Sequence, residues 1–377
     1  MLPGQAKRIT MHEAFIARQE MARPLIGVHI WDREYRKMYR ETNATIPEKG
    51  EVRPEQIETE RFLRDVERLL SMNEQIGGDL YWPVVPYVYI PWMEAIIGCP
   101  IYSSENTFYA KPCIDSWSDF REDPDLSGNT WLAKLLELQK ALVKKIGGAY
   151  PLSSSSHLRG PVDMMAAALG QTRLPLECYD NPERIQAMCA SYSRAFLEVA
   201  HMQNEITATA GFGGSTVNGY GVWTPQVCQY VQDDAMAFLS PDIYTTFVAH
   251  NHATIARGFP SIFYHLHPVS LFVLDQLLAM EKMSILEINR EPEAIGPSIR
   301  ELMPAFKKTL EHGKCLLINF TQGAVGMGLF ERELELICDT LPNKGVSIYV
   351  MAEDAEDGAR RMGVLQEVLA KRGSPTS

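Results

Sequence analysis

The segment Ser261-Ile262-Phe263-Tyr264-His265-Leu266-His267-Pro268 is a short apolar run that ends in two histidines one residue apart. A run of this length and composition predicts a β-strand. Because side chains alternate between the faces of a strand, His265 and His267 are expected to point the same way, and Pro268 ends the pairing just beyond them. Two imidazoles at one strand exit suit a divalent metal ion or an anionic substrate, and either use needs a third group from elsewhere. The alternative is a pair of ordinary polar residues at a strand end.

The composition is that of a globular protein. The 377 residues are 46% hydrophobic and 22% charged, which is enough apolar material for a large core. The longest apolar runs fall far short of the ~20 residues that cross a bilayer, and the N-terminus lacks the apolar segment of a signal peptide, so we expect a cytoplasmic protein with no membrane partner. The net charge of −11 disfavours a nucleic-acid partner. The seven cysteines are scattered without a C-x-x-C pair, which is typical of reduced thiols.

Strand-like and helical patterns alternate along the chain. Because each helical crossover returns the chain to the same end of a sheet, this alternation predicts parallel strands. Eight such units predict an α/β fold, a single-domain (β/α)₈ TIM barrel over residues 1–377, with an irregular insertion after strand two at residues 87–127. A doubly wound open sheet is the alternative, although Gly211-Phe212-Gly213-Gly214 fits a dinucleotide-binding turn poorly. The predicted strands are residues 25–31, 79–85, 150–157, 211–223, 261–267, 284–288, 315–320 and 346–351.

The residues that close the strands of such a barrel share one mouth, where barrel enzymes carry their chemistry. Glu287 interrupts an apolar strand, and a buried carboxylate is costly unless it has a partner, so we expect it beside His265 or His267. Two histidines and a carboxylate would hold Zn²⁺ as a Lewis acid, whereas a Glu–His hydrogen bond without metal is the alternative. The catalytic candidates are Glu287, His265 and Tyr220, and the substrate-binding candidates are His29, Trp31, Arg159, Asn218, Trp223 and Asn319.

Four segments together resemble the uroporphyrinogen decarboxylase superfamily, which includes zinc-dependent coenzyme M methyltransferases and is structurally akin to cobalamin-independent methionine synthase. The resemblance covers most of the chain and implies the same barrel. The four segments are Arg23-Pro24-Leu25 through Tyr35, Gly160-Pro161-Val162 to Leu169-Gly170, Asp234 with Leu239-Ser240-Pro241, and the histidine strand itself.

Departures from the decarboxylase pattern argue against uroporphyrinogen as the substrate. The stretch at residues 84–91 has no carboxylate where the decarboxylases carry an aspartate, and only Arg33 and Arg36 remain of their arginine-rich loop. The methyltransferases bind zinc through H-x-C and a later cysteine, and methionine synthase adds a glutamate on the following strand. This chain has H-x-H and keeps Glu287, and imidazole in place of thiolate makes the metal a harder Lewis acid. The resemblance implies His265, His267 and Glu287 as ligands, with Glu353 as the candidate fourth.

Three functions remain open at this point. The first is a metal-dependent methyl- or alkyltransferase, or a carbon–heteroatom lyase, acting on a small molecule. The second is a metal-free, decarboxylase-like enzyme in which His265 and Glu287 act as an acid–base pair. The third is a module that works beside a separate corrinoid protein, with the corrinoid in trans because the chain has no D-x-H-x-x-G loop. The relatives are commonly homodimers, so the resemblance is compatible with a homodimer and leaves the oligomeric state open.

Overall fold

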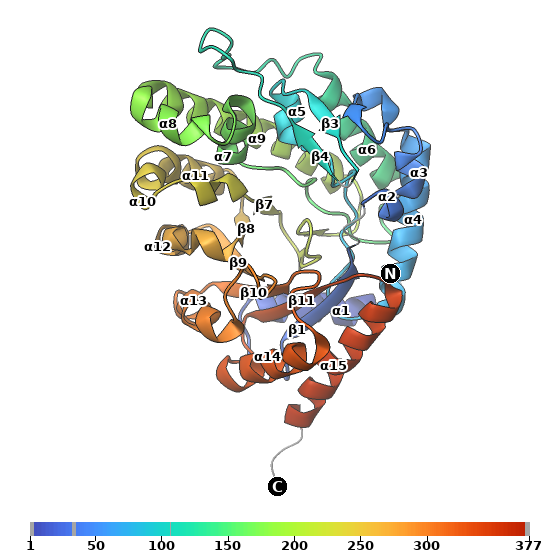
Figure 1. Ribbon diagram of the computed structural model, residues 1–377. Helices are drawn as coiled ribbons and strands as arrows, with labels where there is room; N and C mark the ends of the chain where they lie inside the picture. The colour runs from blue at the N-terminus through green and yellow to red at the C-terminus, as the bar shows by residue number, and fades with distance from the viewer. Residues whose placement is uncertain (1–3, 32–34, 106, 374–377) are drawn as a thin grey trace.

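A curled sheet of six parallel strands forms a half-barrel at the centre of the molecule (Figure 1). The computed structural model describes residues 4–31, 35–105 and 107–373, so Arg33 of the predicted arginine-containing loop lies outside the described residues. Nearly every residue of these strands is buried, as expected for a parallel sheet covered on both faces. In spatial order the strands are β1 (Leu25–Ile30), β11 (Val346–Ala352), β10 (Cys315–Phe320), β9 (Met283–Arg290), β8 (Ser261–Leu266) and β7 (Cys228–Val231).

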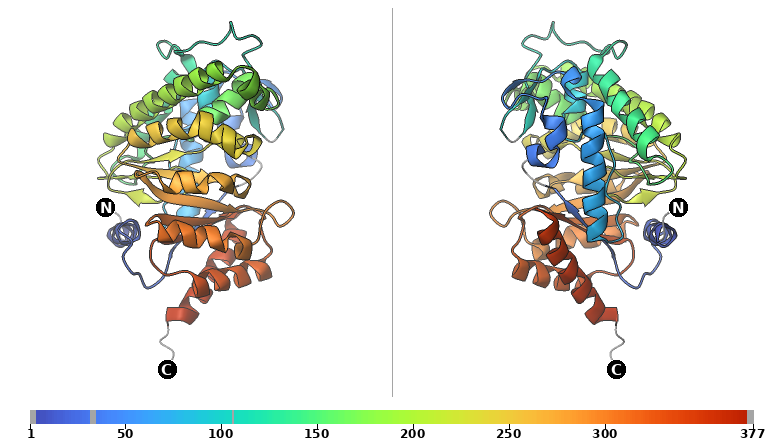
Figure 2. Two further views of the ribbon diagram at one scale, coloured as in Figure 1. Left: turned by 90° about the vertical axis from the view of Figure 1, so that its left-hand side faces the viewer. Right: turned by 90° about the vertical axis from the view of Figure 1, so that its right-hand side faces the viewer.

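The second half of the chain confirms the predicted strand–helix rhythm. Helices α11 (Ala249–Arg257), α13 (Ile299–Glu311) and α15 (Ala355–Gly373) pack against β8, β10 and β11, and they lie on the outer side of the sheet (Figure 2). Ser298 caps α13, since its side chain accepts from the backbone N–H of Glu301 while the Glu301 carboxylate reaches back.

The predicted strands at residues 79–85 and 150–157 are not regular strands. They form only the isolated bridges of Val84 with Leu152 and of Ser153 with Thr216, and Gly78, just before the first segment, bridges Gly27. Pro83 and Pro86 have no N–H to donate to a neighbouring strand, and the N–H of Ser156 donates to the Gln203 side chain at 2.8 Å instead. Regular strands therefore surround about half of the barrel interior.

The prediction of a strand at residues 211–223 was wrong. This segment contains β5 (Ser215–Thr216), which pairs antiparallel with β6 (Trp223–Thr224), and the parallel strand of the unit is β7. Gly219 and Gly221 have positive φ, which lets the chain reverse. The tip of this hairpin fills the space inside the curled sheet, where Tyr220 stacks on Phe263 with 4.9 Å between ring centroids.

The insertion at residues 87–127 contributes β3 (Ile101–Ser103) and β4 (Phe108–Ala110), which form a small antiparallel sheet with β2 (Gly50–Glu51). Helix α5 (Trp92–Ile96) precedes the β3–β4 hairpin, and both lie at the end of the half-barrel above β7 and β8 in Figure 1. This insertion was expected to be irregular, and its short strands carry residues that face the candidate site described below.

The segment from residue 234 to residue 257 is divided into several short helices and turns. Pro241 cannot lie inside a regular helix, and the Ser240 hydroxyl accepts from the N–H of Ile243 to start a new one. Asp234 consequently stands in a short 3₁₀ turn directly after β7.

None of the described helices is long and apolar enough to span a bilayer. The remaining elements are α1 (Gln5–Ile16), α2 (Tyr35–Met38), α3 (Arg40–Asn43), η1 (Pro54–Gln56), α4 (Thr59–Ile76), α6 (Thr130–Ile146), α7 (Pro161–Leu169), α8 (Arg173–Asp180), α9 (Pro182–Ala208), η2 (Asp234–Phe238), α10 (Pro241–Ile243), η3 (Tyr244–Val248), η4 (Pro268–Val273), α12 (Leu274–Leu278) and α14 (Met327–Thr340).

Two glycines of the β5–β6 hairpin provide a test of this packing. A Cβ at Gly221 would lie 1.6 Å from the carbonyl oxygen of Tyr81, whereas a Cβ at Gly219 would have no atom within 4 Å. We expect Gly219→Ala to cost about 1–2 kcal/mol for its left-handed backbone alone, and Gly221→Ala to cost at least ~2 kcal/mol more. Chemical denaturation measures both, and equal losses would contradict the close approach of the hairpin to residue 81.

Candidate metal centre

Three side chains from neighbouring strands converge at the carboxyl ends of β7 and β8. Asp234 follows β7, His265 lies in β8 and His267 comes directly after β8. The Nε2 atoms of His265 and His267 lie 3.7 and 3.4 Å from Asp234 Oδ1. Within the described residues, these three form the one group of three or more His, Cys, Asp or Glu side chains whose ligand atoms all lie within 4.8 Å of one another.

A carboxylate holds each imidazole from behind. Glu287 lies opposite His265 in the register of β8 and β9, and its Oε2 contacts His265 Nδ1. Glu291 Oε1 lies 2.5 Å from Nδ1 of His267. Because both Nδ1 atoms are engaged in this way, both Nε2 atoms are directed toward Asp234. Carboxylate–histidine pairs of this kind orient imidazoles in protein metal sites.

The charges around the three residues favour a bound cation. Burial opposes the charged form of His267, but the hydrogen bonds to Asp234 and Glu291 outweigh it and raise the pKa of this imidazole to about 10. Burial also opposes ionisation of Asp234, and the hydrogen bond from His267 with the positive charges nearby holds the pKa of this carboxyl below its usual range. His267 therefore carries a proton at pH 7. A divalent cation that replaced this proton would place a larger positive charge beside Asp234.

The donor set fits zinc. Two imidazole nitrogens and one carboxylate oxygen are the three protein ligands typical of a catalytic zinc site that keeps its fourth position open. Asp234 is 41% exposed, so the group is reached from outside the core. Glu287 Oε1 is buried with no hydrogen-bond partner among the described residues, which leaves one oxygen behind the site uncompensated.

Two of the predicted ligands take other places. Glu287 is completely buried on the Nδ1 side of His265, as its hydrogen-bond partner, and Asp234 supplies the carboxylate of the group. Glu353 is exposed in the loop after β11, outside the group formed by the described residues, and its N–H donates to Asp357. Asp234 belongs to one of the four segments that carry the resemblance, but it was not assigned as a ligand. The fourth strand was predicted at residues 211–223, so the sequence did not indicate that Asp234 follows a strand, β7.

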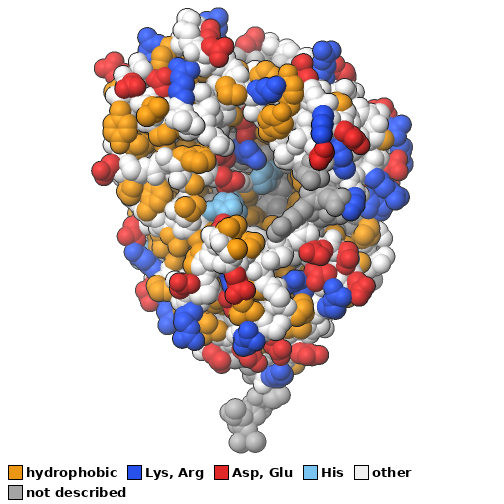
Figure 3. Space-filling view, in the orientation of Figure 1, with side chains coloured by type: hydrophobic (Ala, Val, Ile, Leu, Met, Phe, Trp, Pro, Cys, Tyr) orange, Lys and Arg blue, Asp and Glu red, His pale blue; other side chains and the backbone are white. Residues whose placement is uncertain are grey.

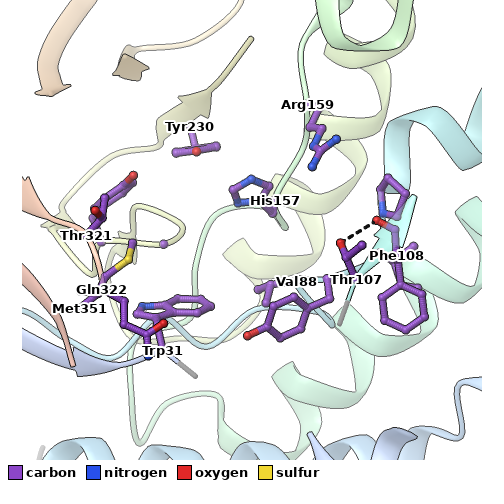
Figure 4. A pocket seen from close by; sticks show the side chains of 15 residues that line it. Trp31, Val88, Thr107, Phe108, His157, Arg159, Tyr230, Thr321, Gln322 and Met351 are labelled. Carbon is purple, nitrogen blue, oxygen red and sulfur yellow. Dashed lines mark hydrogen bonds between the residues drawn. The ribbon is translucent and has the colours of Figure 1, made fainter. Parts of the chain in front are cut away.

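A cavity of about 410 Å³ adjoins this group. Trp31, His157, Arg159 and Tyr230 line it together with Tyr220 (Figure 4). Tyr220 also links the cavity to the histidines, because its hydroxyl lies 2.8 Å from His265 Nδ1. Burial lowers the pKa of His157 to about 4, so this imidazole is neutral at pH 7.

A second cavity of about 680 Å³ is lined in part by Asp234. Arg159 and Phe108 line both cavities, and the Arg159 guanidinium donates to Glu94 Oε1 at 3.2 Å. The space-filling view shows a hollow with histidine side chains at this end of the molecule (Figure 3). Two separate spaces therefore meet at Arg159 beside the three converging residues.

Four of the six predicted substrate-binding residues lie at the smaller cavity or beside a residue of the site. Trp31 and Arg159 line the smaller cavity. Asn218 and Asn319 support site residues: Asn218 lies 3.2 Å from His157 Nδ1, and Asn319 donates to Asn289, which in turn contacts His267.

His29 and Trp223 stand apart from both cavities as the described residues form them. His29 packs edge-on against Tyr349 inside the half-barrel, where burial lowers its pKa to about 3. The Trp223 N–H donates to His12 of α1 at 3.0 Å, because residues 211–223 form a hairpin rather than a barrel strand. These two residues serve the core.

Removal of any one of the three converging side chains is expected to abolish metal binding. We expect wild-type protein loaded with zinc and dialysed to retain one equivalent, and Asp234→Ala, His265→Ala and His267→Ala to retain less than about a tenth, because two ligands cannot compete with buffer. Glu353→Ala is the matched control and keeps the wild-type content. Elemental analysis measures all five proteins, and zinc retained by the three variants would contradict the site.

No known protein-family model matches this chain, and no curated protein matches it in sequence. The resemblance to the uroporphyrinogen decarboxylase superfamily therefore stays a prediction from the quoted motifs. What the protein does has to be argued from the geometry of the site.

Proposed function

We propose that the protein is a metal-dependent enzyme that transfers a methyl or other alkyl group, or cleaves a carbon–heteroatom bond, on a small molecule. The observation that carries the proposal is the convergence of His265 Nε2, His267 Nε2 and an Asp234 oxygen, with a carboxylate behind each imidazole. A zinc ion bound there would supply Lewis acidity and lower the pKa of a thiol, alcohol or water ligand.

The protein's own groups provide position and charge. Glu287 and Glu291 hold the two imidazoles in one orientation, which keeps the ligand atoms aligned before a substrate arrives. The Arg159 guanidinium, 43% exposed between the two cavities, is placed to bind an anionic group of the substrate. Trp31 and Tyr230 give the smaller cavity an aromatic wall that suits a flat or apolar group.

The two cavities favour group transfer over a lyase reaction. A transfer needs a donor and an acceptor bound at once, and each of the two spaces is large enough for a small molecule. Both reach Arg159, and the larger one reaches Asp234. Substrates held in the two cavities would bring their reacting ends together beside the metal ligands, which is the main advantage of holding two reactants in one site.

We also propose that the irregular first half of the chain completes an eight-unit barrel of the type that the quoted motifs imply. Backbone hydrogen bonds support a closed path: Asp79 N–H donates to Ile26 at 2.7 Å, Ser153 N–H to Val84 at 3.0 Å, and Gly160 N–H to Gln232 at 2.7 Å. The converging residues would then lie at the carboxyl ends of the strands, the usual place for the chemistry of such barrels.

A second candidate function needs no metal. The direct contact between Glu287 and His265 Nδ1 also suits an acid–base pair, in which the buried carboxylate keeps the imidazole oriented while Nε2 exchanges a proton with the substrate. The two candidates differ in what they require of Glu287, and this difference can be measured.

Alkylation of a small thiol tests the proposal without knowledge of the natural substrate. Zinc-loaded protein should accelerate the methylation of 2-mercaptoethanol by methyl iodide by at least about 10²-fold over metal-free protein, because a metal ligand thiol is deprotonated. The initial rate of S-methyl product formation is the measurement. Equal rates with and without zinc would contradict metal-dependent alkyl transfer.

Glu287→Gln separates the two candidates, with Glu291→Gln as its matched control. If both carboxylates only orient imidazoles, each variant should bind zinc roughly 10–100-fold more weakly and keep most of its rate at saturating zinc. If Glu287 and His265 form an acid–base pair, Glu287→Gln alone should lower turnover of the natural substrate by ~10²–10⁴-fold, whether or not zinc is present.

A further inference from the structure

Two cysteines far from the metal ligands lie in contact. The Sγ atoms of Cys99 and Cys113 are 3.4 Å apart and form a hydrogen bond. Cys99 lies two residues before β3 and Cys113 three residues after β4, so the pair joins the two ends of the β3–β4 hairpin. The N–H of Lys111 donates to the carbonyl of Pro100 at 2.9 Å, which holds these two chain segments side by side.

The two thiols differ in access and in acidity. Cys99 is buried, whereas Cys113 is half-buried and lines a cavity of about 340 Å³ together with Arg121. The hydrogen bond from Cys99 lowers the pKa of Cys113, and the same contact raises the pKa of Cys99. Burial raises the pKa of Cys228 and of Cys315 to about 12, which makes these thiols unreactive by comparison.

We propose that Cys99 and Cys113 form a reversible dithiol–disulfide site that is oxidised by small disulfides. The Cys113 thiolate attacks one sulfur of the small disulfide, forms a mixed disulfide and releases the first small thiol. Cys99 then attacks the Cys113 sulfur, closes the protein disulfide and releases the second small thiol. The two protons lost by the cysteines end on the two released thiols, so the small disulfide is reduced as the protein dithiol is oxidised.

The geometry needs only a small adjustment for this bond. A disulfide has its sulfur atoms about 2.0 Å apart, so the two Sγ atoms, which lie 3.4 Å apart, must approach by about 1.4 Å. The reaction draws on a pair of side chains that the fold has already brought together.

Oxidation would act on the walls of both cavities at the candidate metal centre. Phe108, in β4, lines the smaller and the larger cavity, and Glu94, whose carbonyl accepts from the N–H of Cys99, pairs with Arg159. A disulfide at the base of the hairpin restrains this segment, because a cross-link reduces the local openings available to the chain it encloses. Oxidation of Cys99 and Cys113 would thus restrain the β3–β4 hairpin, whatever reaction the metal centre catalyses.

Titration with 2-hydroxyethyl disulfide, a small neutral oxidant, tests the proposal on the intact protein. Wild-type protein should fall from seven thiols to five, with a mass lower by two hydrogen atoms and a Cys99–Cys113 cross-link in the peptide map, and dithiothreitol should restore all seven. Hydrogen exchange in the segment from residue 101 to residue 110 should slow on oxidation. Seven thiols remaining, or a cross-link between other cysteines, would overturn the proposal.

Single substitutions fix the order of the two steps. Cys99→Ser should stop at a stable mixed disulfide on Cys113, visible as the added mass of one 2-mercaptoethanol group, because no second thiol is there to displace it. Cys113→Ser should stay unmodified at Cys99, because Cys99 is buried. The matched control Cys338→Ser should form the cross-link as the wild type does. Uptake by Cys113→Ser instead of Cys99→Ser would show that the attacking thiol has been misassigned.

Discussion

The contact between the Glu287 carboxylate and His265 Nδ1 is the interaction on which the site depends. Glu287 is completely buried in β9 between the apolar residues Leu286 and Ile288, and a buried charge without a partner costs several kcal/mol. The imidazole offsets that cost, and the Tyr220 hydroxyl, 2.8 Å from the same nitrogen, adds a second polar group. With Nδ1 occupied, His265 can present only Nε2 to the mouth, which decides where a ligand can bind.

The parallel sheet then brings the other groups to the same place. In the register of β8 and β9, His265 lies beside Glu287, and two residues further along His267 meets Asn289 and Glu291. The turn after β7 adds Asp234 from the next strand. The β5–β6 hairpin fills the interior of the curled sheet, and His265 stacks against Tyr220 of this hairpin.

The sequence predicted the regular half of the fold better than the irregular half. Residues 315–320 and 346–351 are mainly apolar runs between amphipathic helices, with Asn319 and Ser347 as polar exceptions, and both became strands with nearly the expected bounds. Residues 211–223 contain five glycines and were predicted as one extended strand. They form part of a hairpin, whose position depends on the close approach of Gly221 to residue 81. Local pattern carries no information on such a contact.

The candidate site shows the same division. The shared face of His265 and His267 and the pairing of Glu287 with a histidine follow from strand periodicity and from the cost of burying a carboxylate, and both were predicted. Asp234 and Glu291 were not assigned, because the first depends on where β7 ends and the second lies in a loop beyond β9. The Cys99–Cys113 contact joins the two ends of a hairpin that the sequence left unassigned.

X-ray absorption at the zinc edge of the zinc-loaded protein tests the central claim most directly. The account predicts a first shell of two imidazole nitrogens and carboxylate or water oxygens at ~2.0–2.2 Å, without sulfur, and the loss of one imidazole in His267→Ala. A sulfur shell near ~2.3 Å, or a shell without imidazole, would place the metal on other residues and contradict the assignment of Asp234, His265 and His267.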